Sequence, residues 1–315
     1  MKLLISRRLP DSVMAAAAAR FDVTDRAGDG PMTQAECIAA LAEQDAVIPT
    51  LGDAFGAEVF ASAASPRCRL LANFGVGYNH IDTAAAEAAG VAVTNTPGAV
   101  TDATADIAMT LILMTARRAG EGERMVRAGR WTGWHPTQML GLHVTGKTVA
   151  IIGMGRIGQA IARRCHFGFG CRIVYANRSA KTVDFPADRL SLPEAVSTAD
   201  IVVIALPGGA ETNHHIDADV LAAMRPHAIL VNISRGDVID ETALVAALQS
   251  GRIGGAGLDV YEFEPAVPEA LTRMENVTLL PHLGTAALEV REAMGRMALA
   301  NVIALADGEP LPNPV

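Results

Sequence analysis

Three side chains with complementary chemistry stand in the second half of the chain, each in or just after an apolar run. Arg235 lies in VNISRGDVID, Glu264 in DVYEFEP and His282 in LLPHLGTAA. An arginine can hold a carboxylate or a keto oxygen with its planar fork of donors. A histidine can give a proton to a carbonyl oxygen, and a neighbouring carboxylate favours the imidazolium and fixes its orientation. The reduction of a 2-oxo acid requires these three side-chain types, although each one alone is more often structural.

The segment GMGRIG at 153–158 has the glycine spacing of a dinucleotide-binding turn, from which a hydride-donating cofactor could act. Gly153, Gly155 and Gly158 would allow a tight turn, a close approach of backbone to pyrophosphate, and packing of the next helix on the strand. An isolated GxGxxG is a weak signal. Here it follows an apolar strand, opens an amphipathic helix and precedes a second strand. We therefore expect a dinucleotide whose phosphates face the helix N-terminus.

The acidic residue that usually holds the adenosine ribose hydroxyls is missing from its expected place. RIVYANRS (172–179) lies at that distance from the glycines, with Asn177 where Asp or Glu is common. A carboxylate there would repel a 2′-phosphate. Asn177 can instead donate a hydrogen bond, Arg178 offers a fork for phosphate oxygens and Ser179 offers a hydroxyl donor. The segment therefore predicts NADP(H) as the cofactor, preferred over NAD(H).

The elements that must position these residues follow from apolar runs that alternate with helical segments, a pattern that predicts parallel sheets. In the first series, strands are expected at 2–6, 45–50, 69–75 and 91–97, with helices near 12–21 and 33–44. A long helix follows over 101–118. The second series opens with a strand, turn and helix over 147–165. It continues with strands within 171–179, 199–207, 227–236, 252–265 and 276–284, and a last helix over 287–308.

That last helix follows the second series but could pack back on the first. We therefore expect an α/β protein of two Rossmann-like, doubly wound parallel-sheet domains. The substrate (catalytic) domain would be discontinuous, 1–98 and 286–315, and the dinucleotide-binding domain would span 99–285. Ligands of such sheets bind at the carboxyl ends of the strands, so the active site is expected in the cleft between the domains.

Composition and charge disfavour several classes of partner. A length of 315 residues favours two domains, and a net charge of −8 disfavours nucleic acid or an acidic membrane surface. No stretch approaches the length of a membrane span, and the first residues lack a secretory signal, so we expect a cytoplasmic protein. The four cysteines form no CxxC pair and the other histidines have no metal-ligand spacing. Reduced cysteines and no metal are expected.

Taken together, the motifs resemble the D-isomer-specific 2-hydroxyacid dehydrogenase family, and are most similar to its glyoxylate/hydroxypyruvate reductase branch. The resemblance runs from about residue 45 to the C-terminus. It is carried by NFGVGYNHID (73–82), TPGAVTDATADIAMTLIL (96–113), GKTVAIIGMGRIGQAIARR, LVNISRGDVIDETALVAAL, GAGLDVYEFEP and NVTLLPHLGTAA. It implies an NADPH-dependent reduction of a small 2-oxo acid, glyoxylate or hydroxypyruvate, to the D-2-hydroxy acid.

The resemblance also implies roles for single positions. The catalytic Arg, Glu and His fall on Arg235, Glu264 and His282, with His282 as general acid, whereas Glu262 comes two residues too early. Arg235 and His282 would also bind substrate, together with the backbone N–H groups of Val76 and Gly77. The residues expected around the cofactor are Thr104, Gly153, Gly155, Arg156, Ile157, Gly158, Asn177, Arg178, Ser179, Pro207, Thr212, Ile233, Asp259, His282 and Gly284.

Relatives form homodimers through an arm, which the resemblance places at 118–146, where Trp131, Trp134, Met139 and Leu140 lie. Two other functions stay open. One is reduction of a longer 2-oxo acid such as 2-ketogluconate, and the other is a cofactor-sensing scaffold similar to the C-terminal-binding-protein corepressors, which retain the triad. Formate dehydrogenase is disfavoured because it generally has Gln at the position of Glu264. Phosphoglycerate dehydrogenase is disfavoured because it often adds a regulatory domain, for which this sequence leaves no room.

Overall fold

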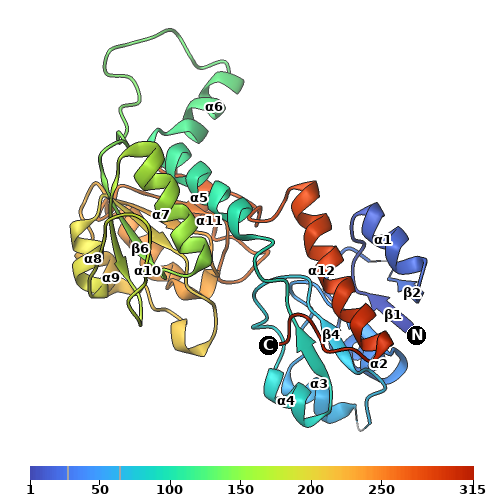
Figure 1. The fold of residues 1–315 in the computed structure, drawn as a ribbon. Helices are drawn as coiled ribbons and strands as arrows, with labels where there is room; N and C mark the ends of the chain where they lie inside the picture. The colour runs from blue at the N-terminus through green and yellow to red at the C-terminus, as the bar shows by residue number, and fades with distance from the viewer. Residues whose placement is uncertain (27, 64) are drawn as a thin grey trace. The chain divides into compact units, whose positions relative to one another are not determined.

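The computed structural model describes residues 1–26, 28–63 and 65–315, which divide into two compact units. Unit 1 comprises Met1–Val100 and Thr285–Val315, and unit 2 comprises Thr101–Gly284. The divisions at 100/101 and 284/285 lie beside the expected ones at 98/99 and 285/286. Each unit holds one sheet of parallel strands with helices between them (Figure 1). The predicted fold class, two parallel-sheet α/β domains, is confirmed.

Unit 1 is built on a five-stranded sheet in the order β2-β1-β3-β4-β5. The last helix of the chain, α12, packs on β3 and β4 beside α1, so it belongs to unit 1 although it follows unit 2 in the sequence. Residues of α2, α3 and α4 form an apolar core with alternate residues of the strands. The elements are β1 (Lys2–Ile5), α1 (Asp11–Ala18), β2 (Asp22–Asp25), α2 (Gln34–Glu43), β3 (Ala46–Ile48), α3 (Ala57–Ser62), β4 (Leu70–Ala72), α4 (Thr83–Ala88), β5 (Ala92–Thr94) and α12 (Leu288–Asp307).

Unit 2 is built on a seven-stranded sheet in the order β12-β11-β10-β9-β6-β7-β8. The order reverses between β6 and β9, which is where ligands bind in sheets of this kind. The elements are α5 (Thr101–Ala116), α6 (Ala119–Arg127), β6 (Thr148–Ile152), α7 (Arg156–Phe169), β7 (Arg172–Ala176), β8 (Ala187–Arg189), α8 (Leu192–Thr198), β9 (Ile201–Ile204), η1 (Ala210–Thr212), α9 (Ala218–Ala223), β10 (Ile229–Asn232), η2 (Gly236–Val238), α10 (Glu241–Gln249), β11 (Gly255–Leu258), α11 (Glu269–Arg273) and β12 (Val277–Leu279).

The central strands of unit 2 are mostly apolar, as expected for strands covered by helices on both faces of the sheet. In β6, Val149 and Ile151 point to the core shared with α5 and α7, and Ala150 and Ile152 point to the core shared with α8, α9 and α10. Helices α5 and α7 contact each other on their face (Figure 1). A strand packed on both faces is held rigidly, so the residue that follows it has a well-defined position.

The structure corrects several element boundaries. Strand β7 ends at Ala176 rather than at 179, because the Asn177 side chain accepts a hydrogen bond from Met154 N–H and the chain turns there. The edge strands β2 (DVTD) and β8 (ADR) were missed, since both are polar and partly exposed. Helix α5 stops at Ala116 rather than 118. The N–H of Leu142 donates a hydrogen bond to the carbonyl oxygen of Ala116, and the backbone of Arg118 lies in the left-handed region with φ 53°.

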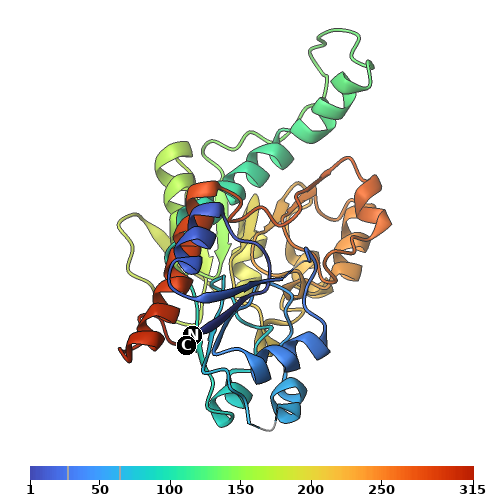
Figure 2. The same ribbon diagram turned by 90° about the vertical axis from the view of Figure 1, so that its right-hand side faces the viewer.

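The segment 118–146, named the arm below, connects α5 to β6. It contains α6 followed by an irregular stretch over 129–141, and it extends away from the sheet of unit 2 (Figure 2). Near its end, Gly141 lies so close to α5 that an added Cβ would be 2.3 Å from the carbonyl oxygen of Ala116. The base of the arm is therefore fixed on α5. None of the helices that the structure describes combines the length and the apolar character that a membrane span requires.

Candidate active site

The predicted site residues of unit 2 follow the carboxyl ends of six of its parallel strands. Gly153 follows β6, Asn177 follows β7, Pro207 follows β9, Arg235 follows β10, Asp259 follows β11 and His282 follows β12. Because the strands are parallel, these ends lie along one edge of the sheet, named the carboxyl edge below. The strand order places Arg235, Glu264 and His282 on neighbouring strand ends and the glycine turn beyond β9.

The glycine turn has the geometry that its sequence predicts. Gly153 has φ 101°, and an added Cβ would lie 2.5 Å from the carbonyl oxygen of Ala205, so a side chain there is excluded. At Gly158 an added Cβ would lie 2.1 Å from the carbonyl oxygen of Gly153, which shows how closely α7 packs on the turn. Nothing lies within 4 Å of the corresponding position at Gly155.

This turn fits a pyrophosphate. Gly155 is the N-cap residue of α7, and Arg156 and Ile157 open that helix of 14 residues. The first N–H groups of a helix lack partners within it and carry a partial positive charge, which suits an anion. The open space at Gly155 is what the backbone needs to approach phosphate oxygens. The residues present therefore fit a dinucleotide cofactor.

The loop after β7 is held from two sides. The amide oxygen of Asn177 accepts from Met154 N–H at 3.2 Å, and its amide nitrogen donates to the carbonyl of Ser179 at 2.9 Å. Both ends of this side chain are thus used within the protein. A direct hydrogen bond from Asn177 to a cofactor would require it to exchange one of these contacts.

Two charged residues beside this loop, Glu211 and Arg189, were not identified from the sequence. Arg178 donates to the carboxylate of Glu211 at 3.1 Å, and Glu211 belongs to η1, after β9. Arg189, at the end of β8, donates to the carbonyl oxygens of Asn177 at 3.1 Å and Arg178 at 2.7 Å. Glu211 lies 33 residues from Arg178 in sequence, so local spacing gave no signal for this contact.

Arg235 is partly buried after β10. Its guanidinium donates to the carbonyl of Ser234 at 2.7 Å, and its own carbonyl accepts from the Asn232 side chain at 2.9 Å. Gly208 gives it room, because an added Cβ there would lie 2.6 Å from Arg235 Cγ. Burial lowers the pKa of Arg235, whereas the negative charges of Glu264 and Asp237 oppose that shift.

Glu264 and His282 form a direct pair. The distance from His282 Nδ1 to Glu264 Oε2 is 2.9 Å, and each side chain is 30% exposed. The other carboxylate oxygen of Glu264 accepts from the Tyr261 N–H at 3.0 Å. Burial by itself would raise the pKa of Glu264, but the hydrogen bond and charge of His282, the Tyr261 N–H and the charge of Arg235 together lower it. Glu264 is thus a carboxylate whose ionised form is favoured.

The backbone at His282 is strained, with φ 55° in the left-handed region. Such a conformation is uncommon for a residue other than glycine and persists where surrounding contacts impose it. Asp259 supplies them. Its carbonyl accepts from His282 N–H at 2.9 Å, and its carboxylate accepts from the N–H groups of Leu283 at 2.6 Å and Gly284 at 2.8 Å. Burial raises the pKa of this carboxyl, against the effect of those two N–H donors and of His282.

The remaining predicted cofactor residues lie along the same edge or beside it. The Thr212 hydroxyl donates to the carbonyl of Pro207 at 2.7 Å, closing the loop after β9. The Thr104 hydroxyl of α5 donates to the carbonyl of Gly284 at 3.2 Å, beside the turn of His282. Ile233 is buried directly after β10. Thr104 and Gly284 therefore lie near His282, and Pro207 and Thr212 lie in the loop that carries Glu211.

Glu262 has a partner of its own. It accepts from His214 Nε2, in the loop after β9, at 2.7 Å and from the backbone N–H of Glu241, at the start of α10, at 3.3 Å. Through its own backbone N–H, Glu262 also contacts the buried carboxylate of Glu241 at 3.5 Å. The acid two residues before Glu264 therefore ties the loop after β11 to the loop after β9 and to α10. This second His–Glu pair joins residues 48 positions apart and was not predicted from the sequence.

Val76 and Gly77 belong to unit 1 and follow β4. The Asn95 side chain donates to the carbonyl of Val76 at 2.9 Å, and the Asn73 side chain donates to the carbonyl of Gly77 at 3.0 Å. These contacts fix the peptide planes of the loop at the carboxyl end of the five-stranded sheet.

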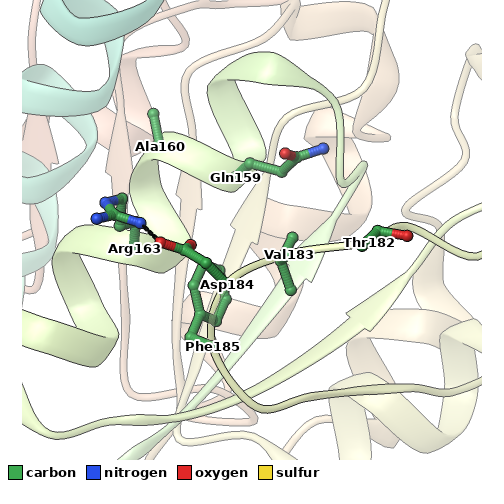
Figure 3. A pocket seen from close by; sticks show the side chains of 7 residues that line it. All are labelled: Gln159, Ala160, Arg163, Thr182, Val183, Asp184 and Phe185. Carbon is green, nitrogen blue, oxygen red and sulfur yellow. Dashed lines mark hydrogen bonds and ion pairs between the residues drawn. The ribbon is translucent and has the colours of Figure 1, made fainter.

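A surface hollow of about 460 Å³ lies between α7 and the segment 182–185 (Figure 3). It is lined by Gln159, Ala160 and Arg163 of α7 and by residues 182–185, and it includes none of the predicted site residues. Arg163 and Asp184 pair across it, as Figure 3 shows. We assign no function to it.

Among the described residues, no group of three or more His, Cys, Asp or Glu is arranged to hold a metal ion.

Comparisons with known proteins agree with this geometry. Residues 109–284 match the family model described as D-isomer specific 2-hydroxyacid dehydrogenase, NAD binding domain. The chain is 42% identical over 318 aligned positions to a glyoxylate reductase of Thermococcus onnurineus, covering 99% of this chain and 94% of that protein. It is 41% identical to a glyoxylate reductase of Pyrococcus furiosus, covering 98% of this chain and 93% of that protein.

Solved structures are similarly close. The crystal structure of the TT0316 protein of Thermus thermophilus matches this chain with a TM-score of 0.93 and 39% identity. The match covers 100% of both chains. An NADPH-dependent glyoxylate/hydroxypyruvate reductase of Sinorhizobium meliloti, in complex with NADP and malonate, matches with a TM-score of 0.88 and 35% identity. That match covers 100% of this chain and 96% of the other.

Proposed function

The chain belongs to the D-isomer-specific 2-hydroxyacid dehydrogenase family, and we propose that it uses NADPH to reduce a small 2-oxo acid, glyoxylate or hydroxypyruvate. Its relatives support the coarser statement directly: it is an oxidoreductase that reduces a 2-oxo acid with a nicotinamide cofactor. The observation that supports the proposed chemistry best is the contact of 2.9 Å between His282 and Glu264, on strand ends next to that of Arg235.

In the proposed reaction, the bound cofactor supplies a hydride to the carbonyl carbon of the substrate. His282 gives the proton to the carbonyl oxygen, which yields the D-2-hydroxy acid. Glu264 stabilises the protonated imidazole and orients it through Nδ1, which leaves Nε2 to face the substrate. Arg235 holds the carboxylate or keto oxygen of the substrate with two donors. The backbone N–H groups of Val76 and Gly77 would bind the carboxylate.

NADPH is the proposed cofactor because the loop after β7 has Asn177 in place of an acid and carries the exposed guanidinium of Arg178. Hydrogen bonds to charged groups contribute about 1.5–3 kcal/mol each, and about 1.4 kcal/mol corresponds to tenfold in affinity. We therefore expect kcat/KM with NADPH to exceed that with NADH at least about tenfold. Equal or better turnover with NADH would contradict this proposal.

A panel of substrates tests the reaction itself. The consumption of NADPH is followed with glyoxylate, hydroxypyruvate and 2-ketogluconate, and kcat/KM is compared. We expect the two small acids to be the better substrates. A higher kcat/KM for 2-ketogluconate would favour the longer-substrate alternative. Cofactor binding without turnover of any 2-oxo acid would favour the sensing scaffold.

Two further features belong to the proposal. The arm exposes Trp131, Trp134 and Leu140, and we propose that it pairs with a second copy to form a homodimer.

The four cysteines, Cys37, Cys68, Cys165 and Cys171, are free and buried. Unpaired cysteines are usual in a reducing compartment, which supports a cytoplasmic location.

A further inference from the structure

Arg178 and Glu211 form an ion pair between two loops that flank the glycine turn. Arg178 follows β7 and Glu211 follows β9, and in the sheet these strands lie on either side of β6. The guanidinium donates to the carboxylate at 3.1 Å. A carboxylate thus stands next to the cation that is proposed to bind the 2′-phosphate.

This pair is easily exchanged. The two side chains are 89% and 85% exposed, so solvent screens their attraction and holding them together costs side-chain freedom. A phosphate offers the guanidinium more negative charge than a carboxylate and a matching set of oxygens. In a complex with the 2′-phosphorylated cofactor, Arg178 would therefore leave Glu211.

The backbone of Arg178 is held while its side chain is free to move. Arg189 donates to the carbonyl oxygens of Asn177 and Arg178, and the Asn177 side chain bonds to Met154 and Ser179. The loop therefore keeps its position when the guanidinium changes partner. Glu211 is anchored independently, in η1, where the Thr212 hydroxyl contacts the carbonyls of Pro207 and Gly209.

We propose that Glu211 is a specificity-determining residue that limits the preference for the 2′-phosphorylated cofactor. It neutralises Arg178 when the ribose carries no phosphate, and it opposes the phosphate by competing for the guanidinium and by its own charge. This inference rests on the proposed role of Arg178 at the 2′-phosphate. Removing the negative charge that pairs with Arg178 at 3.1 Å should tighten binding of the 2′-phosphorylated cofactor about fivefold, which corresponds to about 1 kcal/mol.

The test measures the dissociation constants of NADP⁺ and NAD⁺ by calorimetry on the full-length protein and on Glu211→Gln, which keeps the shape and removes the charge. We expect NADP⁺ to bind about fivefold more tightly to the variant and NAD⁺ to change less than about twofold. The gain should shrink at about 1 M salt, where the screening length falls to about 3 Å. The gain from Glu211→Gln should also be smaller in the Arg178→Ala background, where the competition for the guanidinium is absent and only the direct repulsion by Glu211 is removed.

The matched control is Glu123→Gln, which removes the acid of another exposed Arg–Glu pair, with Arg127 on α6, and changes the net charge equally. An unchanged affinity of Glu211→Gln for NADP⁺ would overturn the inference, as would equal tightening of NAD⁺ or an equal gain in the control. Weaker binding of NADP⁺ than of NAD⁺ by the unmutated protein would instead contradict the proposed cofactor preference. The effect of Glu211→Gln is read as a change between two proteins, so the two failures are distinguishable.

Discussion

At the scale of single residues, the proposed chemistry depends on how His282 is held. Its ring contacts Glu264 at 2.9 Å, and its backbone is kept in the left-handed region by Asp259. A strained residue of this kind costs roughly 1–3 kcal/mol. The buried carboxylate of Asp259, which accepts two further N–H groups of the same turn, offsets that cost. Asp259 therefore positions the turn whether or not it also contacts the cofactor.

Replacing His282 by alanine tests its role as general acid. Because such catalysis contributes roughly 10²–10⁴-fold, kcat/KM for glyoxylate should fall by at least about 100-fold while the affinity for NADP⁺ stays near its original value. Steady-state kinetics and calorimetry measure the two quantities. His227→Ala is the control, since His227 also contacts an acid, Asp200, but lies before β10, at the opposite edge of the sheet. A loss below about tenfold for His282→Ala would rule out the role.

Replacing Glu264 by glutamine tests the partner of His282. The pKa of Glu264 is lowered in the protein, so this group is ionised at neutral pH and stabilises a protonated imidazole. Reduction needs that proton. Without the anion, the fall of kcat/KM on the alkaline side should begin at lower pH, whereas the fold and cofactor affinity remain. A pH profile that coincides with that of the unmutated protein would show that Glu264 does not act through His282.

At the scale of elements, the loops of the carboxyl edge depend on contacts between segments distant in the chain. His214 and Glu262 connect the loops after β9 and β11, and Gly236 lies so close to the loop after β11 that an added Cβ would be 1.8 Å from the carbonyl carbon of Tyr261. The Arg235 loop and the Glu264 loop are therefore packed as one piece. A substitution that displaces one of these loops should therefore displace the other.

The His214–Glu262 contact predicts a pH-dependent contribution to stability. The hydrogen bond to Glu262, with smaller effects of Asp240 and Asp237, raises the pKa of His214. A raised folded-state pKa stabilises the fold fully below the ordinary histidine pKa of about 6.5, and this contribution is lost as the pH rises through the folded-state value. The Tm of His214→Gln should therefore lie further below that of the unmutated protein at about pH 6 than at about pH 9.

His215→Gln, one residue further along the same loop, is the matched control for this measurement. Its Tm should differ from that of the unmutated protein by a similar amount at both pH values. A constant difference for His214→Gln across the range would mean that the charged pair does not form in solution.

What the sequence could predict follows the same division between local and distant contacts. The glycine turn, the triad types and most central strands are visible locally, because each depends on a short pattern of apolar runs, glycines and polar residues at strand ends. The polar edge strands β2 and β8 lack such a pattern. Glu211, Arg189 and the His214–Glu262 pair were missed because the fold alone brings them together, across 33, 11 and 48 residues.

At the scale of the whole molecule, the arm exposes an apolar surface that could bind another protein. Val126, Trp131, Trp134 and Leu140 are exposed on it, and Gly122, Met125, Val126, Trp131, Gln138 and Met139 line a hollow of about 300 Å³. Apolar side chains gathered in this way usually mark a contact with another protein. We propose a second copy of this chain as the partner, as the resemblance stated in the sequence analysis implies.

The homodimer can be tested by removing the apolar side chains of the arm. Sedimentation at micromolar concentration should give the mass of two chains for the unmutated protein. Trp134 is 78% exposed and Leu140 is 67% exposed, so replacing both by serine leaves no cavity in the fold and should shift the protein toward one chain with little change in Tm. Phe167→Ser is the control, because Phe167 is 59% exposed on α7, outside the arm. A single-chain mass for the unmutated protein would contradict the proposal. A dimer that survives the double substitution would place the interface elsewhere, since an interface anchored on these side chains would lose the buried aromatic contact that contributes most of its affinity.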